Sequence, residues 1–243
     1  MRWLVVLAAT GCGFPHGALG SGDATQTGDD AGDDGGDDAP PLDGRIDGPP
    51  PLCNKADLDL VSCFTFDGNV TEGSSYNHSI STSSLSFVAG HNGQAVKIST
   101  GSDITIGGNN PTSYNVSTFT FKMWIKPSSL PGTGLRMGLI DSGNRYRMFL
   151  LPGGALRCAL TGGPDLISQT GIVVTGVWQR VACTFDGTFT RIFVDGVQKA
   201  VVMQTATVGT SSGGIVIGQN NPNGDNFDGA MDDFQLWGSI VAP

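Results

Sequence analysis

The segment STFTFKMWIKP, residues 117–127, alternates apolar and polar side chains with a period of two. One face of this segment carries Phe119, Phe121, Met123 and Ile125. The other face carries Thr118, Thr120, Lys122 and Lys126. The alternation predicts a β-strand with one face in a core. It leaves Trp124 as a large aromatic side chain on the polar face.

The same periodicity continues outward along the chain. Residues 190–202, TRIFVDGVQKAVV, predict a hairpin with Asp195-Gly196 as its two-residue turn, because glycine tolerates the positive φ that the turn requires. Residues 57–68, DLDLVSCFTFDG, predict an opening strand with one apolar face, formed by Leu58, Leu60, Phe64 and Phe66. No long stretch has helical spacing, and the chain contains 37 glycines and only 14% charged residues. We therefore expect an all-β fold, an antiparallel β-sandwich or jelly roll.

The charge of −9 is concentrated near the N-terminus. Nine acidic and two basic residues ahead of Cys53 give −7, whereas the 13 acidic and 11 basic residues that follow give −2. Residues 21–52 are rich in Asp, Gly and Pro and poor in apolar side chains, which predicts a disordered linker. Residues 53–243 are long enough for one domain with its own core. Neither part has a basic patch, so we expect no nucleic-acid partner.

Residues 1–20 have the features of a secretory signal: Arg2, a short apolar run, and small residues ahead of Cys12. Residues 9–12, ATGC, resemble the bacterial lipobox, in which the cysteine is lipidated, although leucine usually occupies the position of Ala9. Cleavage after Gly20 would instead give a soluble secreted protein. We favour lipidation of Cys12. The expected location is the bacterial cell envelope, with membrane contact only through the N-terminal lipid, or else the medium.

If Cys12 is lipidated, four cysteines remain, and an even number in an exported chain indicates disulfides. Three pairings are formally possible. Short spacing favours Cys53 with Cys63. Cys158 and Cys183 each lie on the apolar face of a strand candidate, so a sandwich can bring them together. A zinc site is the alternative, but its usual CxxC or CxH spacing is absent.

Five segments in a fixed order resemble one family. They are STFTFKMWIKP (117–127), GVWQRVACTFDG (176–187), TRIFVDGVQKA (190–200), GGIVIGQ (213–219) and FDGAMDDFQLW (227–237). Together with LVSCFTFDGNVTEGSS (60–75), they are similar to bacterial laminin-G-like jelly-roll modules of the concanavalin A-like superfamily. The resemblance spans about residues 57–240 and implies a two-sheet sandwich, in agreement with the periodicity.

The resemblance also implies two kinds of site. Many laminin-G-like domains hold a structural calcium ion at the sandwich rim, and the corresponding candidates here are Asp67, Asn69, Asp232 and Asp233. An ordinary Asp-Gly turn and a loop cap compete with that interpretation. Sugar binding needs an exposed aromatic platform with polar neighbours, and the candidates for this role are Trp124 and Tyr146. Trp178 and Trp237 match family positions that we expect to be core.

Catalysis is not expected. Retaining glycosidases need two carboxyl groups about 5 Å apart, and the domain has a single glutamate, Glu72, in a loop segment. Asp232 and Asp233 are adjacent, so on a strand they would point to opposite faces. His78 and His91 lie in glycine- and serine-rich sequence without a nucleophile elbow, which predicts ordinary surface histidines.

The sequence therefore predicts a non-catalytic, exported binding module that recognises carbohydrate or a cell-surface polymer. The alternative is a structural or adhesive domain that contacts proteins and has no sugar site. An exported glycoside hydrolase is a distant third possibility, because the carboxylates are missing. Calcium is the one cofactor expected.

Overall fold

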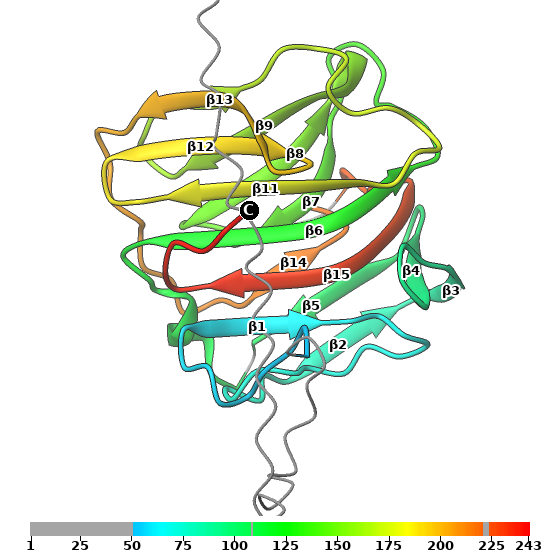
Figure 1. Cartoon of the computed structure of the whole chain (residues 1–243), viewed down its shortest axis with the longest axis horizontal. Coiled ribbons are helices and arrows are strands. Elements are labelled where there is room, and N and C mark those ends of the chain that lie inside the picture. Colours follow the sequence, from blue (N-terminus) through cyan, green and yellow to red (C-terminus); the bar gives the residue numbers. More distant parts are fainter. Residues whose placement is uncertain (1–50, 108, 221–223) are drawn as a thin grey trace, which may run out of the picture. The chain divides into compact units, whose positions relative to one another are not determined.

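The computed structural model describes residues 51–107, 109–220 and 224–243. These residues form two antiparallel sheets that face each other as a sandwich (Figure 1). Sheet A has the strand order β13-β12-β11-β6-β15-β4-β3, with β1 also paired to β15. Sheet B has the order β10-β9-β8-β7-β14-β5-β2. The all-β sandwich expected from the sequence is confirmed.

The strands are short, and most connections are tight turns. Sheet A consists of β1 (Leu60–Phe64), β3 (Ser86–Ala89), β4 (Gln94–Ile98), β6 (Phe119–Pro127), β11 (Gln179–Phe185), β12 (Phe189–Val194), β13 (Val197–Met203) and β15 (Gly229–Trp237). Sheet B consists of β2 (Ile80–Ser83), β5 (Asp103–Ile106), β7 (Met137–Asp141), β8 (Tyr146–Leu151), β9 (Ala155–Leu160), β10 (Leu166–Ile167) and β14 (Ile215–Ile217). Two single-turn 3₁₀ helices, η1 (Pro111–Tyr114) and η2 (Pro152–Gly154), interrupt the chain.

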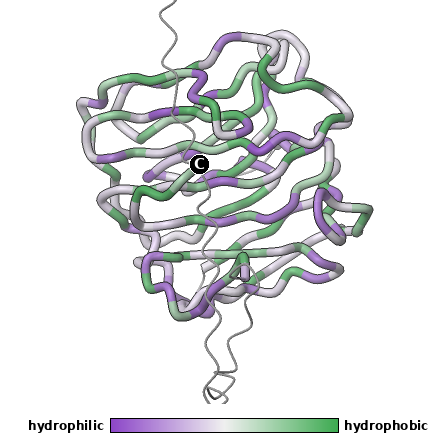
Figure 2. The backbone as a smooth tube through the Cα atoms, viewed as in Figure 1, coloured by the Kyte–Doolittle hydropathy of each residue, from purple (hydrophilic) through white to green (hydrophobic). Residues whose placement is uncertain are grey.

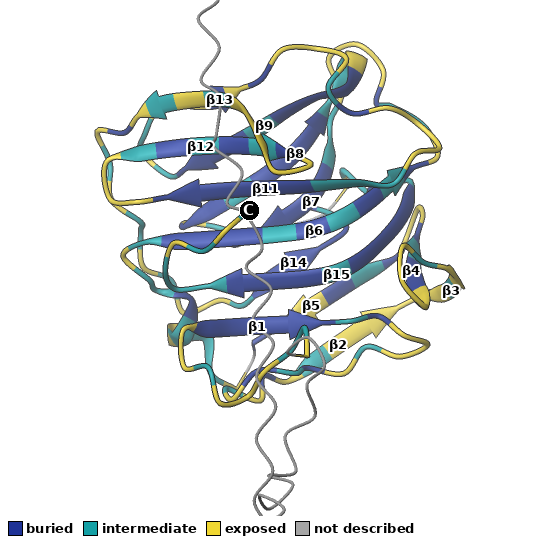
Figure 3. Ribbon diagram, viewed as in Figure 1, coloured by how far each residue is buried: buried dark blue, intermediate teal, exposed yellow. Residues whose placement is uncertain are grey.

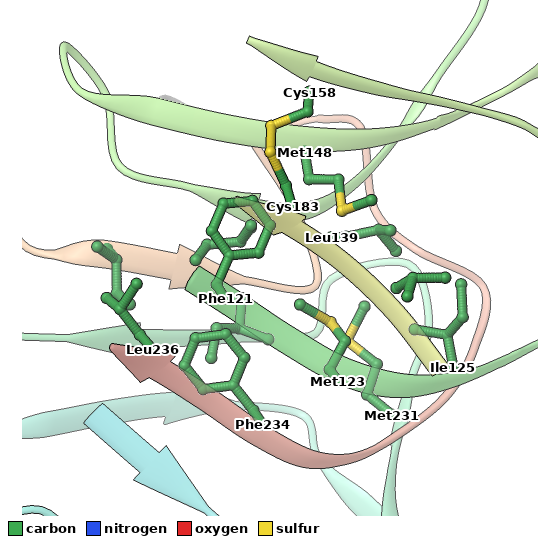
Figure 4. Packing of buried hydrophobic residues seen from close by; sticks show 14 of the residues in the cluster. Phe121, Met123, Ile125, Leu139, Met148, Cys158, Cys183, Met231, Phe234 and Leu236 are labelled. Carbon is green, nitrogen blue, oxygen red and sulfur yellow. A yellow bond between two sulfur atoms is a disulfide. The ribbon is translucent and has the colours of Figure 1, made fainter. Parts of the chain in front are cut away.

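Strand β6 at the centre of sheet A shows why the chain folds this way. Its four apolar residues are fully or almost fully buried between the sheets, as the alternation predicts. Figure 4 shows Phe121, Met123 and Ile125 in this core beside Leu139 and Met148 of sheet B. The alternation is visible as successive hydrophilic and hydrophobic positions along the strands in Figure 2 and as alternating burial in Figure 3.

The predicted hairpin forms where expected. Asp195 and Gly196 have φ of 52° and 75°, so both central turn residues are left-handed, as a type I′ turn requires. The opening strand is shorter than predicted, because β1 ends at Phe64. Leu58 is 72% exposed, so its assignment to the core face is wrong. Phe66 is buried, but it lies beyond the strand at φ 59°.

Both predicted disulfides are present. Cys53 is bonded to Cys63 in β1, and Cys158 in β9 is bonded to Cys183 in β11. The second bridge joins sheet B to sheet A through the core, as Figure 4 shows. Two disulfides in an extracellular type of fold indicate an exported protein.

The described residues contain no helix long and apolar enough to cross a membrane. The predicted signal segment, the lipidation site at Cys12 and most of the predicted linker lie outside the described residues.

Candidate functional site

The outer face of sheet A carries a group of three aromatic side chains around Trp124. The imidazole ring of His91 stacks on the Trp124 indole with 3.5 Å between ring centroids and an angle of 10° between planes. Trp178 meets the same imidazole ring edge-on, at 6.4 Å. We call Trp124, His91 and Trp178 the aromatic group. Trp124 and Trp178 are half-buried and His91 is exposed, so together they offer apolar surface to a ligand.

The loop between β3 and β4 holds His91 in place. The Oδ2 atom of Asp232 accepts hydrogen bonds from the backbone N–H of His91 (2.9 Å) and of Asn92 (3.2 Å). Gly90 allows this approach, because a Cβ there would lie 2.6 Å from the same Oδ2 atom. On the other side of the loop, Oδ1 of Asp67 accepts a hydrogen bond from the backbone N–H of Gln94 (2.9 Å). Two carboxylates therefore fix the loop that carries the imidazole ring.

Trp124 lies on the outer face, as its position in the alternation predicts. The flat surface that would stack on a sugar ring is, however, covered by His91. No sequence pattern indicates this contact, because His91 is 33 positions away in a glycine-rich loop. Trp178 and Trp237 are also half-buried rather than core residues, so that expectation is wrong.

Three basic side chains flank Trp124. Lys122 and Lys126 are two positions away on the same face of β6, and Arg180 is its cross-strand partner on β11. The guanidinium carbon of Arg180 lies 6.0 Å from the centre of the indole ring. Burial, and then the charge of Arg180, lower the pKa of Lys122. The basic side chains thus lie along β6 and β11, whereas Asp232, the partner of Trp124 on β15, lies on the opposite side of the indole.

The last residues of the chain cross this face over β6 and β11 (Figure 1). The Nζ atom of Lys122 donates a hydrogen bond to the main-chain oxygen of Ala242 (2.7 Å), and a guanidinium nitrogen of Arg180 donates one to that of Pro243 (2.7 Å). The backbone N–H of Val241 donates to the Thr120 hydroxyl (3.1 Å). This segment occupies one flank of the aromatic group.

A hollow of about 330 Å³ lies on the other flank. Its lining includes apolar side chains and two lysines: Val88, Ala89, Lys97, Lys126, Pro127 and Ala230. The ammonium of Lys97 is paired with Asp228 (3.2 Å) and donates to the Ser128 hydroxyl (2.7 Å). Small-molecule sites start at about 300 Å³, so the hollow can take one small ligand group.

Tyr146, the second predicted ligand contact, is fully buried. It begins β8 and points inward, with its ring 4.5 Å from that of Phe119. The neighbouring Arg145 is also fully buried, and its guanidinium group donates to main-chain oxygens of Pro111, Ser211 and Gly213. The prediction for Tyr146 is wrong, because flanking arginines do not show on which face of a strand a tyrosine lies.

The predicted metal ligands lie near the point where the neighbour of β15 changes from β4 to β1. Residues 229–231 pair with β4 and residues 234–237 pair with β1, with an irregularity at Asp232 and Asp233 between them. Asp67 and Asp232 already bind the His91 loop through carboxylate oxygens, and the Asn69 side chain donates to the main-chain oxygen of Asp67 (3.1 Å). Among the described residues, no group of three or more His, Cys, Asp or Glu side chains is arranged to hold a metal ion.

Asp233 is the most perturbed of these carboxyl groups. Burial, and then the charges of Asp232 and Asp67, raise its pKa to about 6. The pKa of Asp232 is also raised by burial, against the hydrogen bonds that it accepts. Asp233 has φ of 50°, which marks the irregularity in β15. The two adjacent aspartates thus lie at a register shift within β15 rather than on its regular alternation.

A serine, a histidine and a glutamate also form a row. The Nε2 atom of His78 lies 2.7 Å from the Ser113 hydroxyl, and Nδ1 lies 3.8 Å from Oε2 of Glu72. The His78 side chain is wholly buried, stacked on the rings of Tyr76 and Tyr114, so the prediction of a surface histidine is wrong. The Ser113 hydroxyl donates its proton to the main-chain oxygen of Asn110 (2.8 Å) rather than to the imidazole.

Glu72 also forms its hydrogen bonds within the fold. Its carboxylate accepts hydrogen bonds from the backbone N–H of Cys63 and of Ser74, at 3.0 Å each, and from the Ser74 hydroxyl at 2.8 Å. It therefore ties the loop after β1 to that strand. Burial lowers the pKa of His78 against the charge of Glu72. The row stabilises the fold and offers a substrate no access to the imidazole.

Comparison with known proteins adds the family. A model of the concanavalin A-like lectin/glucanases superfamily, of the laminin G type, matches residues 98–242. No curated protein sequence matches this chain. Domain 4 of AbnA, a GH43 extracellular arabinanase from Geobacillus stearothermophilus solved with arabinotriose, is a similar structure, with a TM-score of 0.57 and 18% identity over 74% of this chain and 92% of that domain.

Two toxin domains are also similar. The binding domain of Paraclostridial Mosquitocidal Protein 1 has a TM-score of 0.63 and 15% identity over 76% of this chain. The binding domain of Botulinum Neurotoxin DC, in complex with SialylT, has a TM-score of 0.60 and 17% identity over 77% of this chain. The chain covers 50% of each of these two structures. Since the family model covers more than half of the sequence and the sandwich agrees with it, the chain belongs to the concanavalin A-like lectin/glucanases superfamily.

Proposed function

We propose that this protein is a non-catalytic binding module that recognises carbohydrate on the outer face of sheet A. The observation that carries the proposal is the aromatic group with its basic and polar neighbours. Sugar rings present C–H faces that pack on aromatic surface, while their hydroxyl groups need hydrogen-bond partners. Trp124 and Trp178 supply the aromatic surface. Lys122, Lys126 and Arg180 supply hydrogen-bond donors. The similar arabinanase domain and toxin binding domains support a binding role.

A glycan array tests this function. The purified protein should bind a defined subset of glycans saturably, and Trp124→Ala should abolish that binding by removing the central ring. Trp237→Ala is the matched control, because Trp237 is also half-buried on sheet A but lies outside the aromatic group. A blank array with protein that is shown to be folded would overturn the proposal.

Calcium belongs to this proposal as a structural ion near Asp67, Asp232 and Asp233. Supporting this idea, burial and neighbouring negative charge raise the pKa values of Asp232 and Asp233, and a bound cation would offset both effects. Binding would have to reorganise the loop after β3, since Asp67 and Asp232 already accept its backbone N–H groups. Calorimetric titration of chelator-treated protein with calcium tests the ion directly, and the array repeated with chelator tests its part in recognition.

A second role is favoured by one feature of sheet A. Its edge strand β13 exposes three apolar side chains, Val197 (56%), Val201 (48%) and Met203 (60%). An exposed apolar edge strand is a site where another chain can add. Adhesion to a surface protein through β13 is therefore the alternative, and substitutions on β13, rather than at Trp124, would abolish it. In either role, we propose that lipid on Cys12 anchors the protein.

A further inference from the structure

Four basic side chains lie around Trp124 or line the hollow, and they differ in the hydrogen-bond and ion-pair partners that they have. Lys122 and Arg180 each donate to a main-chain oxygen of the C-terminal segment. Lys97 is paired with Asp228. Lys126 alone of these four has no hydrogen-bond or ion-pair partner within the described parts of the chain. Among these four groups, the Lys126 ammonium is thus the one whose donors are all free for a ligand.

That free charge lies at the hollow. Lys126 lines it together with Lys97, and apolar side chains of Val88, Ala89 and Ala230 form other parts of its wall. Asp228, the one carboxylate bonded to Lys97, is already shared with the Ser129 hydroxyl (2.8 Å). A negatively charged group in the hollow would therefore find Lys126 without a competing carboxylate, beside an apolar wall.

The hollow and the aromatic group lie next to each other along β6. Trp124 and Lys126 are two positions apart on the same face of that strand, and Gly176, two residues before Trp178, also lines the hollow. Neighbouring same-face residues on a strand are about 7 Å apart, roughly the width of one sugar ring. A single acidic sugar residue can therefore reach both features.

We propose that the hollow receives the carboxylate of an acidic sugar, with Lys126 as its ion-pair partner and the sugar ring against the aromatic group. This inference rests on the proposed carbohydrate-binding function and names the class of carbohydrate. The carboxylate can come from a uronic acid or from a sialic acid, since both place it directly on the ring. The neighbouring cations raise the local concentration of such ligands.

Calorimetric titration with matched pairs of sugars tests the proposal. The first pair is a galacturonic acid oligomer and the same oligomer after carboxyl reduction, and the second is sialyllactose and lactose. The acidic member of at least one pair should bind at least tenfold more tightly at low salt, and the preference should shrink as salt is added. Which pair shows the preference identifies the source of the carboxylate.

Two lysine variants localise the effect. Lys126→Gln should abolish the preference for the acidic sugar, because glutamine keeps a hydrogen-bond donor but carries no charge. Lys199→Gln is the matched control and should keep the preference, because Lys199 is exposed on β13, outside both the aromatic group and the hollow. A preference that survives Lys126→Gln, or equal binding of both members of each pair, overturns the inference.

The outcomes also separate this inference from the proposed function. If the array identifies a neutral glycan whose binding Trp124→Ala abolishes, while no acidic sugar is preferred, the carbohydrate module stands and the assignment of Lys126 fails. If no glycan binds at all, both proposals fail together.

Discussion

His91 and Trp124 are held in different ways, and this difference has a consequence for binding. Trp124 lies on a central strand, whereas His91 lies on a loop secured by backbone hydrogen bonds to Asp232. A sugar ring that stacks on the covered surface of Trp124 has to displace the imidazole, which can rotate about its side-chain bonds while the backbone of its loop stays fixed. The exposed ring of His91 therefore covers the site in the unbound protein.

We expect His91→Ala to strengthen sugar binding several-fold, because no stacking contact has to be broken before the ligand binds. Titration followed by tryptophan fluorescence would measure the change, with Trp124→Ala as the control that removes the signal of the site. Weaker binding by His91→Ala would mean that the imidazole itself contacts the sugar.

The pKa of Asp233 predicts a dependence of stability on pH. Since the pKa is raised to about 6, the folded protein holds a proton between about pH 4 and 6 that the unfolded chain has released. This group therefore favours folding more as the pH falls through that window, and the effect is lost as the pH rises.

Asp233→Asn should raise the free energy of unfolding by about 1 kcal/mol at pH 7 and by nothing below pH 4. This gain in free energy is smaller than the one that the same pKa shift implies for a fully buried group, because water still reaches part of the side chain. Asparagine tolerates the φ of 50° at this position. Urea denaturation at several pH values measures the gain. A gain that does not vary with pH would contradict an origin in the charge of Asp233.

At the scale of elements, the bridge between β9 and β11 closes a loop of 25 residues across the two sheets. Replacing Cys158 and Cys183 together by alanine should lower the free energy of unfolding by about 3 kcal/mol or more, since the unfolded chain regains the entropy of that loop. Guanidinium denaturation measures this loss. A loss below about 1 kcal/mol would show that the sheets hold together without the bridge.

The elements also show how far sequence alone leads. Alternation identified β6 and the hairpin at Asp195, because a period of two and a left-handed turn are local properties. Regular alternation is interrupted at Asp232 and Asp233, where β15 changes partners from β4 to β1 and Asp233 has a positive φ. Such an irregularity depends on pairing with strands more than a hundred residues away and leaves no local pattern.

At the scale of the whole molecule, the candidate site was predicted only in part. The outward-facing position of Trp124 followed from the strand pattern. His91, Trp178 and the C-terminal segment reach it from three separate parts of the chain, so neither spacing nor composition could place them there. The prediction for Tyr146 failed because its neighbours in the sequence are polar, although its own side chain faces the core.

The bridge between Cys53 and Cys63 also determines where the domain would bear a mechanical load. A pull on the chain ahead of Cys53 passes through the sulfur atoms directly to Cys63, so residues 54–62 carry none of the tension. The force enters within β1, whose hydrogen bonds to β15 connect it to the centre of sheet A. Reduction of this one bridge would move the loaded point to the start of β1 and let the first strand be peeled from its end.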